Sequence, residues 1–224
     1  MEHYYAVAID GPSGAGKSTL ARALAKELGF VYVDTGAIYR SVGYFARQRG
    51  VDPADEAAVE ALLPEIRLEM LYGEDGLQHM ILNGQDVTRE IRLPEISLYA
   101  SRVSAIPAVR AFLLEMQLGM ARTHSVIMDG RDIGTVVLPQ ADVKLFLTAS
   151  AEDRARRRFL ELEQRGTPQE YDQLLAEIKQ RDYNDAHRAS SPLRQAEDAL
   201  LLDTTGNTFE QSLALLLKTI REKL

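Results

Sequence analysis

The feature that most restricts the fold is a glycine-rich segment close to the N-terminus. Residues 4–9 are a short apolar run rich in β-branched and aromatic side chains, which predicts a buried strand. From Lys17, leucines recur every four residues up to Gly29, which predicts a helix that ends at this glycine. Between them lies the sequence Gly-Pro-Ser-Gly-Ala-Gly-Lys-Ser. A glycine loop that joins a strand to a helix in this way indicates an α/β fold with a parallel sheet.

The composition of this loop suits the binding of phosphate groups. Glycines let consecutive backbone N–H groups point at phosphate oxygens, and the start of the following helix adds the positive end of its dipole. The lysine supplies a mobile cation for the β- and γ-phosphates, and the serine hydroxyl is placed to ligate Mg²⁺. The alternative is a glycine turn that happens to precede a helix. The predicted ATP site consists of Gly11, Pro12, Ser13, Gly14, Ala15, Gly16, Lys17, Ser18 and Thr19.

The rest of the chain predicts a single domain over residues 1–224, in which strands alternate with helices. Further strands are expected at 31–33, 126–129, 143–147 and 200–202, and helices at about 37–49, 54–63, 94 onward, 107–121, 152–163, up to 187, and 208–223. The expected fold is a three-layer α/β/α arrangement around a five-stranded parallel sheet. The segment from about 64 to 92 differs, because short strands separated by glycine turns predict a small, mostly antiparallel insertion.

Composition limits the partners. There is no cysteine, so disulfides, thiolate zinc sites and a cysteine nucleophile are excluded. The net charge of −7 argues against a nucleic acid polymer, whereas clustered arginines between 154 and 188 suggest a small anionic ligand. The N-terminus lacks the pattern of a secretory signal, and the apolar stretches are too short to span a membrane. We therefore expect a cytoplasmic protein that acts on small molecules and is a monomer.

Two further clusters follow predicted strands, where side chains face the ligand crevice of an open parallel sheet. The first places the hydroxyl of Thr35, the ring of Tyr39 and the guanidinium of Arg40 beside the phosphate loop. In the second, Asp129 ends an apolar strand and can orient Mg²⁺ directly or through water. Arg131 follows and could hold an acceptor phosphate with two hydrogen bonds. The alternatives are a core tyrosine beside a solvated arginine in the first cluster, and a polar turn in the second.

Several classes of phosphate-loop protein are disfavoured. The chain lacks the Asn/Thr-Lys-x-Asp guanine motif of GTPases, and no Asp-Glu pair follows the apolar run at 126–128, as it does in oligomeric ATPases. Kinases of small molecules therefore fit best. The combined motifs resemble the bacterial cytidylate kinase family, which acts on CMP and dCMP, and the resemblance runs from about Ala6 to the last helix. The motifs that carry it are Ile9–Ser18, Asp34–Arg40, Asp129–Val137, Arg181-Asp182 and Asp185–Leu193.

The resemblance implies a set of acceptor contacts. It makes the segment 64–92 the CMP-side insertion. Thr35, Arg40 and Arg131 would hold the acceptor phosphate, while Ser101, Arg110 and Asp132 would contact cytosine, with Asp132 accepting from the exocyclic amine. Asp185 would bind the ribose near Tyr39, and Arg188 completes the CMP set. Relatives often carry serine at position 35, and some carry threonine or glycine at position 18, whereas this chain has Thr35 and Ser18.

The arginines of the two helices before residue 190 resemble the short lid of these kinases, here about 153–190. Arg154, Arg157 and Arg158 have spacings that bring them to one helix face, whereas Arg156 points outward. A closing arginine lid would align the substrates, exclude water and neutralise charge. The alternative is a solvated hairpin with internal salt bridges. The predicted catalytic residues are Lys17, Arg131, Arg154, Arg157, Arg158, Arg181 and Arg188.

The hypothesis is transfer of the γ-phosphoryl group of MgATP to CMP or dCMP, with Mg²⁺ held by Ser18 and, through water, by Asp129. One alternative is a kinase of another acceptor, such as AMP, UMP or shikimate. Another is a nucleotide-dependent switch that hydrolyses ATP slowly and acts through a partner. A nucleic-acid repair or packaging ATPase is disfavoured by the acidic charge.

Overall fold

The computed structural model describes residues 3–74, 76–164 and 166–224. Residue 75, in a predicted glycine turn, and residue 165, in the predicted lid, lie outside the described residues. The chain divides into two compact units, a larger unit of Met1–Tyr32 and Ala121–Leu224 and a smaller unit of Val33–Met120. Each unit is described by itself below.

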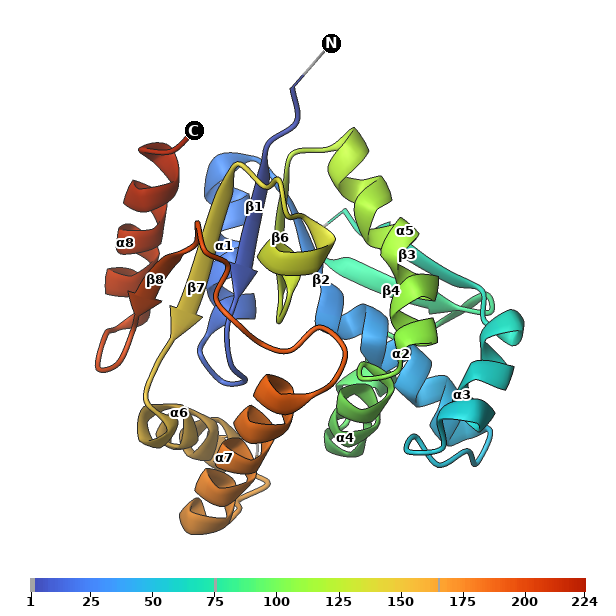
Figure 1. Cartoon of the computed structure of the whole chain (residues 1–224). Helices are drawn as coiled ribbons and strands as arrows, with labels where there is room; N and C mark the ends of the chain where they lie inside the picture. Colours follow the sequence, from blue (N-terminus) through green and yellow to red (C-terminus); the bar gives the residue numbers. More distant parts are fainter. Residues whose placement is uncertain (1–2, 75, 165) are drawn as a thin grey trace. The chain divides into compact units, whose positions relative to one another are not determined.

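The main sheet has five strands in the order β2-β6-β1-β7-β8 (Figure 1). β1 pairs in parallel with β6 and with β7, and β7 pairs in parallel with β8. The prediction of a five-stranded parallel sheet is confirmed. The strands are β1 (Ala6–Asp10), β2 (Val31–Asp34), β6 (Val126–Gly130), β7 (Val143–Thr148) and β8 (Leu200–Asp203).

The core of the larger unit lies between the sheet and helices α1 (Lys17–Leu28) and α8 (Phe209–Arg221). Leu20 and Leu24 of α1 pack with Leu216 of α8 against buried residues of β1, β6 and β7. The four-residue leucine spacing therefore marks the buried face of α1, as the sequence predicted. The remaining elements of this unit are η3 (Ile133–Val137), α6 (Ala151–Gln164) and α7 (Tyr171–His187).

The smaller unit combines helices with a separate sheet of order β3-β4-β5. Both pairings in this sheet are antiparallel, and all three strands lie inside the predicted insertion. Helices α2 (Thr35–Gln48) and α4 (Pro94–Val103) approach each other closely. A Cβ added at Gly43 of α2 would lie 2.9 Å from the backbone nitrogen of Ala100 in α4. The elements beyond β2 are α2 (Thr35–Gln48), α3 (Glu56–Leu62), η1 (Leu63–Glu65), β3 (Leu68–Tyr72), β4 (Gln78–Leu82), β5 (Gln85–Asp86), η2 (Glu90–Arg92), α4 (Pro94–Val103) and α5 (Pro107–Thr123).

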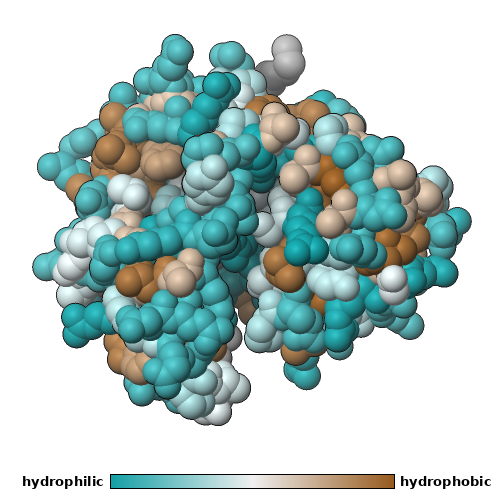
Figure 2. Space-filling view, turned by 60° about the horizontal axis from the view of Figure 1, so that its bottom comes forward, coloured by the Kyte–Doolittle hydropathy of each residue, from teal (hydrophilic) through white to brown (hydrophobic). Residues whose placement is uncertain are grey.

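The surface seen in Figure 2 is mostly hydrophilic, with apolar side chains in scattered patches. Within the described ranges, no single helix is long and apolar enough to cross a membrane. The bent pair α4 and α5 passes that test only when the two helices are taken together, by length and composition.

The first residue of the phosphate loop tolerates no side chain. Gly11 has φ of 147°, and a Cβ there would lie 1.9 Å from the carbonyl oxygen of Leu147. We expect Gly11→Ala to lower the free energy of unfolding by about 3 kcal/mol or more, because backbone must move to relieve the clash. The thermal unfolding midpoint should fall by roughly 10 °C for a chain of this size.

Gly29→Ala is the matched control for this effect. Gly29 also has a positive φ, 69°, but a Cβ there meets nothing within 4 Å. Its replacement should cost only about 1 kcal/mol, the conformational penalty of a left-handed residue. Equal midpoints for the two variants would show that the close approach to Leu147 does not constrain the loop.

Candidate active site

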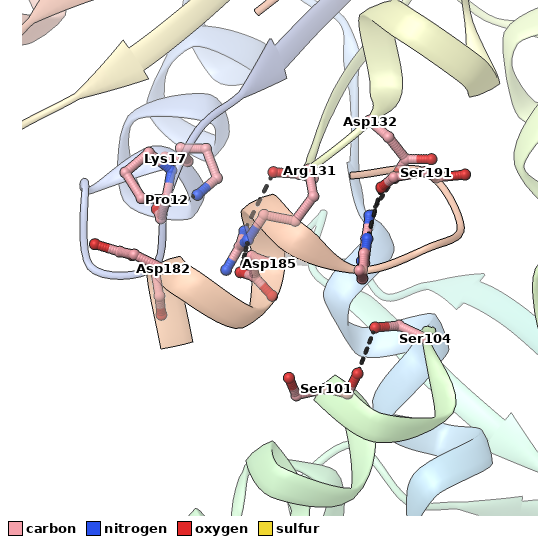
Figure 3. A network of polar contacts seen from close by, with 12 residues as sticks. Pro12, Lys17, Ser101, Ser104, Arg131, Asp132, Asp182, Asp185 and Ser191 are labelled. Atoms are coloured by element: carbon pink, nitrogen blue, oxygen red, sulfur yellow. Dashed lines mark hydrogen bonds and ion pairs between the residues drawn. The ribbon is translucent and has the colours of Figure 1, made fainter. Parts of the chain in front are cut away.

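The phosphate loop connects the end of β1 to the start of α1. Gly16 occupies the N-cap position of α1 in the left-handed conformation and, as a glycine, has no side chain that could cap the helix. The first N–H groups of an α-helix have no partner within the helix, so this end of α1 suits an anion. The Nζ atom of Lys17 donates a hydrogen bond of 2.7 Å to the carbonyl oxygen of Pro12, so the lysine lies back over its own loop (Figure 3).

Lys17 sits in an environment that disfavours its charge. Its side chain is buried, and burial lowers the pKa of Lys17 well below its ordinary value. The positive charge of Arg131 lowers this pKa further, while Asp129 and Asp10 oppose the shift. A polyanion bound at the loop would reverse this balance, because its negative charge would stabilise the ammonium group.

A small cluster of oxygen atoms lies beside the loop. The Ser18 hydroxyl donates a hydrogen bond of 2.9 Å to Asp129, and the Tyr32 hydroxyl donates one of 2.9 Å to the other oxygen of the same carboxylate. The structure thus brings Ser18 and Asp129 together, as expected from their positions after neighbouring strands. Mg²⁺ prefers such oxygen ligands and is usually bound through one or two protein groups plus substrate phosphates, so this donor set fits the ion. Tyr32 was not predicted.

Arginines and aspartates at the end of α7 and in the residues directly after β6 and α7 form a second network in the larger unit (Figure 3). Nε of Arg131 donates a hydrogen bond of 2.8 Å to Asp185. Nη2 of Arg188 lies 3.4 Å from Asp132, and its Nε donates to the carbonyl oxygen of Ser191 at 2.6 Å. Four residues assigned from the resemblance to contacts with CMP are therefore neighbours in space, although 50 residues or more separate Arg131 and Asp132 from Asp185 and Arg188.

Asp185 remains ionised in this network. Burial alone would raise the pKa of Asp185. The guanidinium groups of Arg131, Arg181 and Arg188 outweigh this effect and hold that pKa below its ordinary value. The carboxylate is therefore charged at neutral pH and can accept hydrogen bonds from arginines or from ligand hydroxyl groups.

The arginines of α6 differ in their surroundings. Arg154 is buried, donates to the carbonyl oxygen of Ser13 in the phosphate loop at 3.0 Å, and makes two hydrogen bonds to Asp182 of α7. A Cβ at Gly16 would lie 3.7 Å from the guanidinium of Arg157, so this arginine is also close to the loop. Arg157 further donates to the carbonyl oxygen of Thr204 at 2.8 Å.

Two further arginines of α6, Arg158 and Arg156, have different environments. Arg158 pairs with Glu161 one turn along the same helix at 2.9 Å. Arg156 is exposed, in agreement with the outward orientation expected for it. The helices of the predicted lid thus contain both loop contacts and internal salt bridges, two arrangements that the sequence presented as alternatives.

In the smaller unit, the residues predicted to contact the base form a chain of contacts. The guanidinium carbon of Arg110 lies 5.4 Å from the ring centre of Tyr39, which is a cation–π contact. Arg110 also donates to the carbonyl oxygen of Ser104 at 3.0 Å. The Ser104 hydroxyl in turn donates to the carbonyl oxygen of Ser101 at 2.9 Å (Figure 3). Arg110, Tyr39 and Ser101 therefore belong to one connected group.

A further carboxylate in the smaller unit was not predicted. Asp34 is buried, accepts a hydrogen bond of 2.9 Å from the N–H of Ala37 at the start of α2, and pairs with Arg92 at 2.7 Å. The side chain of Gln78 bonds both backbone groups of Asp34. Burial alone would raise the pKa of Asp34, but Arg92 and Arg40 hold it below its ordinary value. The sequence signal was an aspartate at a helix N-cap position.

The chain matches known proteins along nearly its whole length. A family model described as Cytidylate kinase matches residues 7–222. A cytidylate kinase of Caldicellulosiruptor bescii is 51% identical over 209 residues, which cover 92% of this chain and 91% of that protein. The cytidylate kinase of Syntrophotalea carbinolica is 47% identical over 223 residues, which cover 100% of this chain and 94% of that protein. The cytidylate kinase of Carboxydothermus hydrogenoformans is 48% identical over 217 residues, which cover 97% of each protein.

Proposed function

Because the chain belongs to the cytidylate kinase family, we propose that it transfers the γ-phosphoryl group of ATP to CMP or dCMP, giving ADP and CDP or dCDP. The observation that carries the proposal is the arrangement of the larger unit. It holds a phosphate loop with a buried lysine and, in the same unit, a network of arginines and aspartates suited to a second anionic ligand.

The phosphate loop and its oxygen cluster form the donor side of the proposed reaction. Backbone N–H groups of residues 11–19 and the ammonium of Lys17 would bind the phosphates of ATP. Ser18 would ligate Mg²⁺ and Asp129 would orient it through water, as their 2.9 Å contact supports. When bound, Mg²⁺ neutralises charge on the β- and γ-phosphates.

The acceptor side would read both phosphate and base. Thr35, Arg40 and Arg131 would hold the monophosphate. Asp185 would bind the ribose next to Tyr39. Arg188, which lies 3.4 Å from Asp132, would complete the CMP site. For cytosine, Ser101 and Arg110 would donate to the carbonyl oxygen and ring nitrogen, while Asp132 would accept from the exocyclic amine. Uracil carries a carbonyl oxygen at that position, which offers no proton to Asp132.

The chemical step needs charge neutralisation more than proton transfer. An oxygen of the acceptor phosphate attacks the γ-phosphorus in line, and the bond from that phosphorus to the bridging oxygen of the β-phosphate breaks. A phosphate monoester is already ionised near neutral pH, so a general base is not needed. Arg154, Arg157, Arg158 and Arg181 would close over the transferred group as a lid. A single domain, a monomeric state and a cytoplasmic location are further parts of this proposal.

A panel of acceptors tests the proposal. Release of ADP should be stimulated by CMP and dCMP, with UMP, AMP and shikimate used at least about 100-fold less efficiently, because a site that hydrogen-bonds a polar group rejects analogues that leave it unpaired. Asp132→Asn should lower kcat/KM for CMP by about 100-fold and reduce the ratio of kcat/KM for CMP to that for UMP. KM for ATP should be unchanged. Equal use of UMP and CMP by the wild type would contradict the role of Asp132. ATP hydrolysis that CMP does not stimulate would instead support a nucleotide-dependent switch.

A further inference from the structure

Asp10 is a buried carboxylate to which the reaction scheme above gives no role. It is the last residue of β1, directly before the phosphate loop, and is 4% exposed. One of its oxygens accepts a hydrogen bond of 2.8 Å from the N–H of Ile133, and the other accepts one of 2.7 Å from the N–H of Gly134. One carboxylate therefore binds two consecutive backbone groups of a segment more than 120 residues away in the sequence.

The segment that Asp10 binds has an unusual backbone. Residues Ile133–Val137 form a single π-helical turn, a rare conformation that is frequently found at functional sites. Asp132 precedes this turn with φ of −148° and ψ of 27°, outside the helical and strand regions, and its own side chain does not cap the turn. The first N–H groups of the turn are satisfied by Asp10 instead, so the carboxylate takes the place of a local cap.

The turn packs closely against Asp10 and Lys144. A Cβ at Gly134 would lie 3.4 Å from the Asp10 carboxylate and 3.2 Å from the side chain of Lys144. A side chain at residue 134 would therefore need the Lys144 side chain to move by a few tenths of an ångström. Asp132, the residue directly before this turn, lies 3.4 Å from Arg188. A shift of the turn relative to β1 would move Asp132 away from its position next to Arg188.

The charge of Asp10 costs stability. Burial raises the pKa of Asp10 to about 6, even though its two N–H donors and Lys17 lower it, and the charge of Asp132 adds to the increase. A carboxyl group whose pKa is higher in the folded than in the unfolded state stabilises the fold only at low pH, and that contribution is lost as pH rises from about 4 to about 6. At neutral pH, folding stability alone therefore does not explain why a carboxylate occupies this position.

We propose that Asp10 is a positioning residue, which fixes the turn after β6 so that Asp132 is held in the orientation needed to read the acceptor base. The inference rests on the proposed function of Asp132. In the proposed reaction Asp10 has no contact with either substrate, because both of its oxygens accept hydrogen bonds from the turn. Its effect should therefore appear in the use and selection of the acceptor rather than in the binding of ATP.

Asp10→Asn tests the inference with little change of shape. An amide has one acceptor oxygen and places its NH₂ group against one of the two N–H donors, so one of the two hydrogen bonds is lost. We expect KM for CMP to rise about tenfold and the preference for CMP over UMP to narrow, while KM for ATP, which the lost charge of Asp10 affects only through Lys17, rises by no more than about twofold. Steady-state kinetics with each substrate varied in turn, and with UMP as a second acceptor, measure these values.

Asp142→Asn is the matched control, because Asp142 accepts the N–H of Ala6 at 2.8 Å at the opposite end of the same strand. Its kinetics should equal those of the wild type. If Asp10→Asn does not fold, Asp10→Ser provides a smaller uncharged side chain with one hydroxyl acceptor, and it should likewise raise KM for CMP more than KM for ATP. An unchanged KM and preference for CMP, or equal rises in both KM values, would overturn the inference.

The two proposals can fail separately. If Asp132→Asn loses the preference for CMP while Asp10→Asn retains it, the positioning role is wrong and the reading of cytosine by Asp132 stands. If Asp132→Asn retains that preference, the reading of cytosine by Asp132 is wrong, and the inference about Asp10 falls with it.

Discussion

Replacement of Lys17 by methionine should lower kcat by about 10³-fold while the protein stays folded. The ammonium group is the cation of the phosphate loop, and its 2.7 Å contact with Pro12 places it over the loop. Burial and the charge of Arg131 lower the pKa of Lys17. A negatively charged ligand would therefore stabilise its ammonium group. Methionine keeps a similar length without the charge. Loss of one such electrostatic contact to a phosphoryl group commonly costs two to three orders of magnitude in rate.

The measurement is ADP release at saturating CMP, with circular dichroism to verify folding. Lys26→Met provides the control, because Lys26 lies in the last turn of the same helix and is exposed. It should have wild-type kinetics. Turnover by Lys17→Met within about tenfold of the wild type would contradict the assignment of residues 11–18 to the phosphates of ATP.

The parts of the fold that depend on local patterns could be predicted from the sequence. The leucine period of α1, the glycine that ends it and the short apolar strands are signals within a few residues, and the observed elements agree with them to within about two residues for most boundaries. The antiparallel strands of the insertion were signalled by glycine turns in the same way. The register and order of the strands require contacts that no single segment contains.

The unpredicted residues are those whose partners are distant in the sequence. Tyr32 was assigned only to a strand, yet its hydroxyl holds Asp129, and Asp10 holds a turn more than 120 residues away. The contact between Asp34 and Arg92 similarly spans the insertion. The π-helical turn at 133–137 has no sequence signal of its own, because its first N–H groups bind a carboxylate from another strand. Sequence patterns identified these residue types but not their pairing.

Carboxylates of this acidic chain form ion pairs with several of its arginines. Asp185 holds Arg131, Asp182 holds Arg154, and Asp34 holds Arg92. A long side chain that is already fixed loses less conformational entropy when it binds a ligand, and a planar guanidinium retains donors for a second acceptor. The net charge of −7 is therefore compatible with strong local sites for anions.

Replacement of Arg131 by methionine should lower kcat/KM for CMP by about 10³-fold, the second large effect. Arg131 is connected to residues of both proposed sites, because its positive charge acts on Lys17 and its Nε donates a hydrogen bond of 2.8 Å to Asp185. It would neutralise the acceptor phosphate as that group approaches the γ-phosphoryl group, and such arginine contacts are worth 10³-fold or more in phosphoryl transfer. Arg131→Lys should recover only part of the loss, since lysine lacks the fork that meets two acceptors at once.

Initial rates over a range of CMP and ATP concentrations separate this effect from a general loss of activity. Arg156→Met is the control, since Arg156 is an exposed arginine on α6, and it should behave as the wild type. Removal of Arg131 also removes the positive charge that helps to lower the pKa of Lys17, so KM for ATP should stay constant or fall slightly. A rise of KM for ATP that matches the loss for CMP would place Arg131 on the donor rather than on the acceptor. The direction of the change in KM for ATP therefore decides whether Arg131 binds the phosphates of ATP or the phosphate of the acceptor.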